Sequence, residues 1–235
     1  IAQPVEGQML VRNLFFSLEA AIRGWLDGKA NYFEPIPLGG AIRGPSVARV
    51  ITSHLDGFEA GDLIFGLHHW EDYSLSDANT ILLSKLSPEE DIPLSYYCGG
   101  LGGSGHTAYV GLHEIGNIQA GETVLISAAA GATGSMATQI AKLRGCEVVG
   151  VVGGDNKADL ITQKLGADAA INYKTCGDLT VAINEACPEG VDVYFDNVGG
   201  KTLDAALQCM NTFGRVIGCG MIGDYNDQDN PTPVF

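Results

Sequence analysis

Small residues suited to binding a phosphate occur at positions 128–134, in the run Ala-Ala-Ala-Gly-Ala-Thr-Gly. Their spacing is that of a G-x-G-x-x-G turn whose first glycine is replaced by Ala129. Gly131 would let the backbone approach a pyrophosphate, and Gly134 would let a following helix pack closely on its strand. The N-terminus of that helix adds free N–H groups and the positive end of a dipole. The alternative is a purely structural turn. The residues expected at the pyrophosphate are Gly131, Ala132, Thr133 and Gly134.

The elements around this turn are the ones a dinucleotide site requires. Apolar strands are predicted at 123–127, 148–152, 169–171, 191–195 and 215–219. Helices are predicted between them at about 134–144, 157–165, 179–187 and 203–210. Alternation at this spacing needs crossover connections, so the strands form a parallel sheet covered on both faces. We predict an α/β fold with a Rossmann-type doubly wound sheet. Five strands are countable where a complete fold has six, so we expect the sheet to be incomplete at the C-terminus.

The end of the second of these strands bears on the choice of dinucleotide. An NAD site usually offers an acidic residue there, about 20 residues past the glycines, to bind the ribose hydroxyls. This chain has Gly153 and Gly154 in that place, followed by Asp155 and Lys157. Without the acid a 2′-phosphate meets no repulsion, and Lys157 offers a cation. We therefore expect NADP(H). An inward-pointing Asp155 would oppose it, and the alternative for Lys157 is a solvated lysine in the first turn of a helix.

The part of the chain before about residue 117 is predicted to be rich in β-structure. Strands are expected at 8–12, 47–51 and 61–66, and a helical stretch at 107–115 leads into the second region. We place the domain boundary between residues 117 and 118, which gives a first domain over 1–117 and a nucleotide-binding domain over 118–235.

Composition and charge limit the classes of function. Of the 235 residues, 46% are hydrophobic and 17% are charged, which is typical of a globular protein. The formal net charge is −15 and no run of Lys and Arg occurs, so the chain lacks the basic face that binds nucleic acid or an anionic membrane. We expect neither as a partner.

Cysteine usage and the lack of a targeting segment bear on location. The six cysteines contain no C-x-x-C pair, and we interpret them as reduced thiols. No signal peptide or membrane-length apolar run is present, so the cytoplasm is the expected location. The chain begins in mid-pattern at Ile1, which leaves open a leader ahead of it.

Four segments in order, at 128–135, 139–146, 194–200 and 219–226, carry a resemblance to a known family. With them the chain resembles the zinc-independent medium-chain dehydrogenase/reductases. The most similar group is that of the NADP-dependent alkenal/one oxidoreductases, which contains the prostaglandin, double-bond and curcumin reductases. The resemblance covers nearly all of residues 7–226. It implies a GroES-like catalytic domain for the β-rich first part and a homodimer for the full-length protein, whose relatives continue well beyond Phe235.

The resemblance also implies roles for residues outside the glycine turn. Lys157 would contact the 2′-phosphate, Tyr173 would be a further cofactor contact, and Asn197 would lie near the nicotinamide ribose. The alternatives are an exposed loop aromatic for Tyr173 and a turn-forming residue for Asn197. The residues that would line the nicotinamide end are Cys219, Gly220, Met221, Ile222, Gly223 and Tyr225.

The chain departs from the family at two places that we expect to border the substrate pocket. Residues 18–24 stand where relatives carry an Asp-Pro-Tyr element before Met-Arg-Gly, and His106 stands where an apolar residue is usual. Both departures put the identity of the substrate in doubt, whereas use of the cofactor is less affected.

Metal binding is not expected. Zinc-dependent relatives place His and Glu in a G-H-E-x-x-G element, and the matching residues 39–44 supply neither side chain. The cysteines are too dispersed for a structural zinc site. His68 and His69 are adjacent, so on a strand they would point to opposite faces. We expect them to be a surface pair flanking Trp70.

Without a Lewis acid, reduction of a conjugated C=C bond makes a milder demand than oxidation of an alcohol. Hydride from NADPH would reach the β-carbon of an α,β-unsaturated ketone or aldehyde, and hydrogen-bond donors would stabilise the enolate. We expect the ribose hydroxyl and Tyr225 to be these donors, with Tyr225 or water protonating the α-carbon. The alternative for Tyr225 is packing on the cofactor, and Tyr109 is a weaker candidate expected to pack within its helix. The alternative functions are an NADPH quinone reductase and a non-catalytic NADP-binding scaffold.

Overall fold

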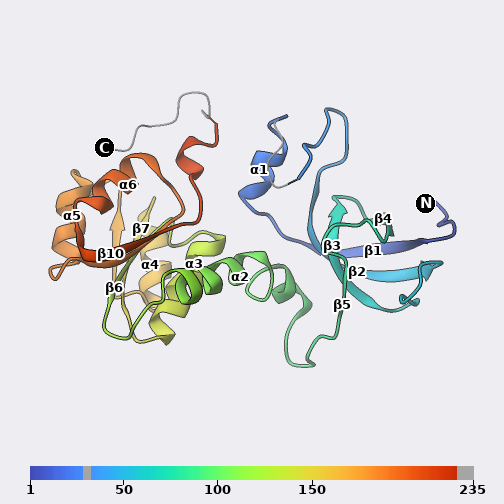
Figure 1. The fold of residues 1–235 in the computed structure, drawn as a ribbon, viewed down its shortest axis with the longest axis horizontal. Helices are drawn as coiled ribbons and strands as arrows, with labels where there is room; N and C mark the ends of the chain where they lie inside the picture. The colour runs from blue at the N-terminus through green and yellow to red at the C-terminus, as the bar shows by residue number, and fades with distance from the viewer. Residues whose placement is uncertain (29–32, 227–235) are drawn as a thin grey trace. The chain divides into compact units, whose positions relative to one another are not determined.

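The computed structural model describes residues 1–28 and 33–226 (Figure 1). The described part of the chain divides between Gly103 and Ser104 into two compact units. Each unit has its own sheet. The domain boundary placed after residue 117 stays a prediction.

The first unit is built on a five-stranded antiparallel sheet with the strand order β4-β1-β2-β3-β5. Its elements are β1 (Gln8–Phe16), α1 (Ala21–Trp25), β2 (Arg43–Ser53), β3 (Leu63–His69), β4 (Tyr73–Asp77), β5 (Ser84–Leu86) and the 3-10 helix η1 (Leu94–Cys98). The strands predicted at 8–12 and 47–51 are confirmed and are longer than expected. The third begins at Leu63, two residues later than predicted, because Gly61 and Asp62 form the turn that enters it.

A buried polar network in this sheet corrects the expectation for His68 and His69. His69 is exposed, but His68 is only 3% exposed. The two rings leave β3 on opposite faces, as predicted, and the inner face is occupied by serine side chains. Nδ1 of His68 lies 2.6 Å from Ser46 Oγ, and Nε2 lies 3.3 Å from Ser76 Oγ. Burial, followed by the charge of His69, lowers the pKa of His68 to about 4.

The buried, neutral His68 should make the first unit sensitive to acid. The unfolded chain binds a proton near pH 6.5, whereas the folded state accepts it only near pH 4. The stability contributed by neutral His68 is therefore complete above pH 6.5 and falls by about 3 kcal/mol as the pH drops to 4. Urea unfolding between pH 7 and 4 should show this loss in the wild type and in His69→Gln, and a smaller loss in His68→Gln. Equal losses in all three proteins would contradict the assignment.

The second unit contains a five-stranded sheet in which every pairing is parallel. The strand order is β10-β9-β6-β7-β8. Read from β8, with the strands of this sheet numbered along the chain, it is the 3-2-1-4-5 order of a Rossmann fold. The strands are β6 (Thr123–Ser127), β7 (Glu147–Val152), β8 (Ala169–Asn172), β9 (Val191–Asp196) and β10 (Met210–Gly218). The predicted doubly wound parallel sheet is confirmed.

Helices pack against both faces of this sheet and enclose a separate core on each (Figure 1). One core includes Ala108, Ala137 and Ile161 from the helices, and the other includes Ile183 and Ala206. The helices are α2 (Gly103–Val110), a turn of π-helix η2 (Gly111–Ile115), α3 (Ala132–Leu143), α4 (Asp155–Gln163), α5 (Leu179–Ala186), α6 (Gly200–Leu207) and the 3-10 helix η3 (Ile222–Asp224).

Three helix starts differ from the prediction. The helices expected from about residues 134, 157 and 203 begin at Ala132, Asp155 and Gly200. In each case the residues ahead of the predicted start are small or polar and have no apolar pattern, so periodicity detects only the part that packs on the sheet.

Candidate active site

The candidate site lies at the carboxyl ends of β6, β9 and β10. The strand order reverses between β6 and β9, and ligands of open α/β sheets bind outside the strand ends at such a point. Three segments named from the sequence begin there. The glycine turn follows β6, Asn197 follows β9, and residues 219–225 follow β10.

The glycine turn is shaped by close backbone contacts. Ala128 has a φ of 48°, in the left-handed region, which turns the chain sharply as it leaves β6. The N–H of Gly131 donates to the Ala128 carbonyl over 2.8 Å. A side chain at Gly134 would place its Cβ 2.9 Å from the Ala129 Cα and nearer still to the Ala128 carbonyl oxygen. The glycine is therefore required sterically, because the fixed atoms it faces are backbone.

This contact brings the start of α3 to the sheet edge. Since α3 begins at Ala132, the N–H groups of Ala132, Thr133 and Gly134 are those that an α-helix leaves unpaired at its N-terminus. Gly131 and Ala132 are exposed, so a pyrophosphate could approach these groups. The local geometry fits the group for which the turn was predicted.

The residues named for the 2′-phosphate gather at the end of β7. The Tyr173 ring lies against Gly153, where an added Cβ would meet its Cε1 and hydroxyl oxygen at 3.0 Å. Lys157 is exposed in the first turn of α4, and no ion pair among the described residues involves it. The Asp155 side chain is held by β8, because its Oδ1 accepts a hydrogen bond from Asn172 Nδ2 over 2.7 Å. The carboxylate is thus engaged by the neighbouring strand β8.

Asn197 connects the ends of β9 and β6. Its Nδ2 donates to the Ser127 carbonyl over 2.7 Å, and its backbone N–H donates to Ser127 Oγ over 2.8 Å. Its own carbonyl accepts from the N–H of Ile222 over 3.2 Å. One residue therefore fixes the spacing between the two strand ends and the loop after β10.

Asp196 is the residue at this edge that our sequence prediction did not include. It is only 4% exposed, and its Oδ1 accepts four hydrogen bonds. The donors are the Tyr194 hydroxyl at 2.7 Å, Ser127 Oγ at 3.1 Å, and the N–H groups of Val198 and Gly199, both at 3.0 Å. An acidic residue at the end of an otherwise apolar strand was the signal that could have identified it, because burial of a charge demands such partners.

The backbone of Asp196 also holds the loop that follows β10. Its carbonyl accepts from the N–H of Cys219 at 2.8 Å and from that of Gly220 at 3.0 Å. Gly223 donates to the Val198 carbonyl over 3.0 Å. Tyr225 is half-buried, and its hydroxyl lies 3.2 Å from the place a Cβ on Gly220 would occupy.

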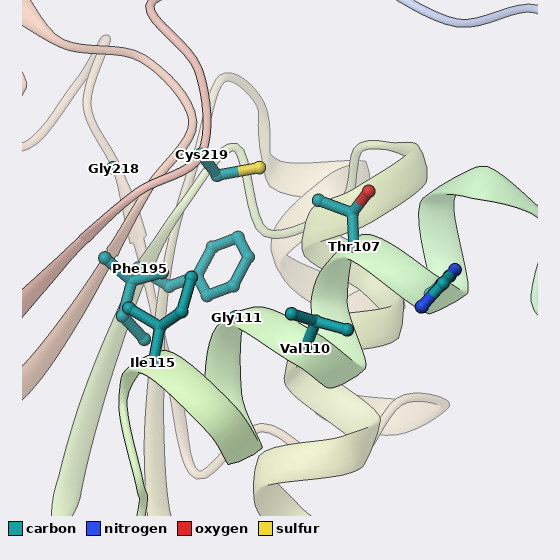
Figure 2. A pocket seen from close by; sticks show the side chains of 9 residues that line it. Thr107, Val110, Gly111, Ile115, Phe195, Gly218 and Cys219 are labelled. Atoms are coloured by element: carbon teal, nitrogen blue, oxygen red, sulfur yellow. The ribbon is translucent and has the colours of Figure 1, made fainter.

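A cavity of about 300 Å³ opens beside this loop (Figure 2). Figure 2 shows the side chains of Cys219 and Thr107 pointing toward one another, with Phe195, Ile115 and Val110 forming an apolar wall. The Phe195 ring packs closely on the backbone of η2 at Gly111, where an added Cβ would lie only 2.8 Å from Phe195 Cε2. The lining residues all belong to the second unit: His106, Thr107, Val110, Gly111, Ile115, Phe195, Ile217, Gly218 and Cys219.

The cavity unites some of the predicted residues and not others. Cys219 lines it, and so does His106, which departs from the family pattern. The nine lining residues do not include Met221, Ile222 or Tyr225. Tyr109 is 51% exposed, and its ring packs on His113 with 4.3 Å between centroids rather than into the core.

The described residues offer no ligand set for a metal ion. No group of three or more His, Cys, Asp or Glu side chains among them could hold one.

The described helices include none that is both long and apolar enough to cross a membrane.

Comparison with known proteins decides the family. A family model described as a zinc-binding dehydrogenase matches residues 132–235, and one described as an N-terminal domain of oxidoreductase matches residues 1–83. The crystal structure of CurA from Vibrio vulnificus in complex with NADPH is 36% identical, with a TM-score of 0.89, and the match covers 99% of this chain and 68% of that one. The chain belongs to the medium-chain dehydrogenase/reductases. The resemblance drawn from the sequence is confirmed.

Two curated relatives indicate the group within this family. A 2-alkenal reductase (NADP(+)-dependent) from Nicotiana tabacum is 44% identical over 219 residues, which cover 93% of this chain and 63% of the relative. An NADPH-dependent curcumin reductase from Escherichia coli is 38% identical over 231 residues, covering 98% and 66%. This medium-chain reductase chain therefore spans just under two thirds of the length of these relatives.

The contact between Gly134 and the end of β6 should be intolerant of a side chain. In Gly134→Ala the start of α3 must shift away from Ala128, which we expect to cost about 1–3 kcal/mol of stability. NADPH affinity, measured by fluorescence titration, should fall about tenfold or more because the N–H groups move. Gly99→Ala is the matched control, since the nearest atom to its added Cβ is 3.9 Å away. Unchanged affinity in Gly134→Ala would contradict the role assigned to the turn.

The thiol in the cavity should react slowly at neutral pH. Burial, followed by the charge of Asp196, raises the pKa of Cys219 to about 11. Iodoacetamide labelling of Cys219, followed by peptide mass spectrometry, should therefore increase with pH up to about 11. In Asp196→Asn the negative charge is lost, so the labelling midpoint should move to lower pH. A midpoint that is the same in both proteins would show that Asp196 does not act on this thiol.

Proposed function

We propose that this protein uses NADPH to reduce the C=C bond of α,β-unsaturated ketones and aldehydes. The names of its relatives, a 2-alkenal reductase and a curcumin reductase, support this class of reaction. The observation that carries the proposal is the nucleotide cradle at the sheet edge. There the N-terminus of α3 meets β6 through Gly134, and the end of β7 offers the exposed Lys157, while Asp155 accepts a hydrogen bond from Asn172.

In this proposal each predicted residue binds or orients one part of the cofactor. Residues 131–134 bind the pyrophosphate through N–H groups, and Lys157 and Tyr173 bind the 2′-phosphate end. Asn197 and the loop 219–223 orient the nicotinamide end. NADPH supplies the hydride that adds to the β-carbon of the enone. Tyr225 donates a hydrogen bond to the enolate oxygen, which is typically worth a hundredfold or so in rate.

The cavity beside Cys219 supports a small, largely apolar substrate. Its volume of about 300 Å³ is at the lower end of ligand sites, and most of its lining is apolar. We propose a cytoplasmic location, for which six unpaired cysteines are the support, and a homodimer, which rests on the family resemblance.

The proposed reaction is tested by following NADPH oxidation with a panel of enones, quinones and alcohols, and by identifying the products. A saturated ketone formed from an enone is the expected result. Hydroquinone formation without any saturated ketone would favour the quinone reductase instead, and NADPH binding without turnover would favour a scaffold.

Lys157 should discriminate between the two cofactors. Removing the charge in Lys157→Ala should raise the KM for NADPH about tenfold, the effect of one charge-assisted contact. The KM for NADH should not change, because NADH lacks the 2′-phosphate. Lys164→Ala, at the other end of α4, is the matched control and should leave both values as in the wild type. An equal rise for NADPH and NADH would show that Lys157 does not bind the 2′-phosphate.

A further inference from the structure

The polar side chains in the cavity are few. Of the residues that line it, only His106, Thr107 and Cys219 carry a polar atom in the side chain. The rest present apolar groups or a glycine backbone. Within the lining itself, these three side chains are therefore the groups that can donate to a substrate.

These three groups differ in their ability to give up a proton. The Cys219 thiol keeps its proton because its pKa is raised to about 11. The Thr107 hydroxyl is a hydrogen-bond donor but not an acid near neutral pH. Imidazole is the side-chain type that both releases and regains a proton near neutral pH. The lining contains one imidazole, that of the exposed residue His106.

The proposed reaction needs such an acid. Once hydride has reached the β-carbon, the α-carbon of the enolate must receive a proton. The buried Asp196 carboxylate lies close enough to Cys219 to raise its pKa, so the field at that end of the cavity opposes a further negative charge. A proton donor in the cavity lining would remove the enolate charge where it forms.

We propose that His106 is the catalytic acid that protonates the α-carbon. The inference rests on the proposed function. An N–H bond of the imidazolium breaks and leaves its electron pair on the nitrogen, the electron pair of the enolate forms the new C–H bond, and the carbonyl is restored. The imidazole then regains a proton from water. NADPH provides both electrons through its hydride, so the step needs no other reductant. The departure from the family's apolar residue at this position is thereby given a chemical role.

The stereochemistry of protonation tests this proposal. An enone with a methyl group on the α-carbon, such as α-methylbenzalacetone, gives a product with a stereocentre where the proton is added. A donor fixed in the cavity adds it from one face, so the wild type should give one enantiomer in large excess. His106→Leu and His106→Gln should give a nearly equal mixture, because water then protonates the enolate from both faces.

Two further variants separate His106 from its neighbours. His113→Gln removes the next histidine along the same helical segment, which does not line the cavity, and should keep the wild-type enantiomer ratio. Tyr225→Phe should turn over more slowly with the ratio preserved. NADPH affinity and the unfolding midpoint of the His106 variants should match the wild type, since His106 is exposed.

The outcomes distinguish this inference from the proposed function. A preserved ratio in both His106 variants, or a ratio lost only in Tyr225→Phe, would overturn the role of His106 while leaving the reductase activity intact. A wild-type protein that oxidises no NADPH with any enone would overturn the proposed function, and the role of His106 with it. A ratio lost in the His106 variants alone supports the assignment.

Discussion

The carboxyl edge of the parallel sheet depends on the buried carboxylate of Asp196. An isolated charge in an apolar interior is strongly unfavourable, and here four donors converge on one oxygen to offset that cost. The donors come from β6, from β9 and from the turn after β9. The backbone carbonyl of the same residue holds Cys219 and Gly220. Asp196, together with its neighbour Asn197, therefore holds the ends of β6 and β9 and the loop after β10 in place relative to one another.

The phosphate end of the site depends on an absence of side chains instead. Gly134 lets α3 begin against the end of β6, and Gly150 performs a related role in β7, where a Cβ would lie 2.7 Å from that of Ala129. Close packing of this kind brings a helix N-terminus to the strand ends, where its unpaired N–H groups and dipole can act on an anion. Hydrogen bonds to Asp196 therefore hold the end of the site at β9 and β10 in place. The phosphate end instead depends on glycines that allow close backbone packing.

The chemistry assigned to the cavity follows from its polarity. Apart from His106, the lining offers only a protonated thiol, one hydroxyl group and apolar groups. The position of His106 matters because it carries the one imidazole among the lining residues.

The amino-acid sequence by itself determined the doubly wound sheet, the glycine turn and the family. Each of these depends on local patterns, namely alternating apolar strands and helices, small residues at fixed spacing, and ordered blocks such as 194–200. Tertiary structure alone decided which polar residues are buried and what they face. Sequence placed His68 on the surface, yet the neighbouring strand β2 brings Ser46 to its ring, and β4, which follows β3 along the chain, brings Ser76. It likewise gave no role to Asp196, because the donors that make a buried carboxylate tolerable come together only when β6 and β9, about seventy residues apart, lie side by side.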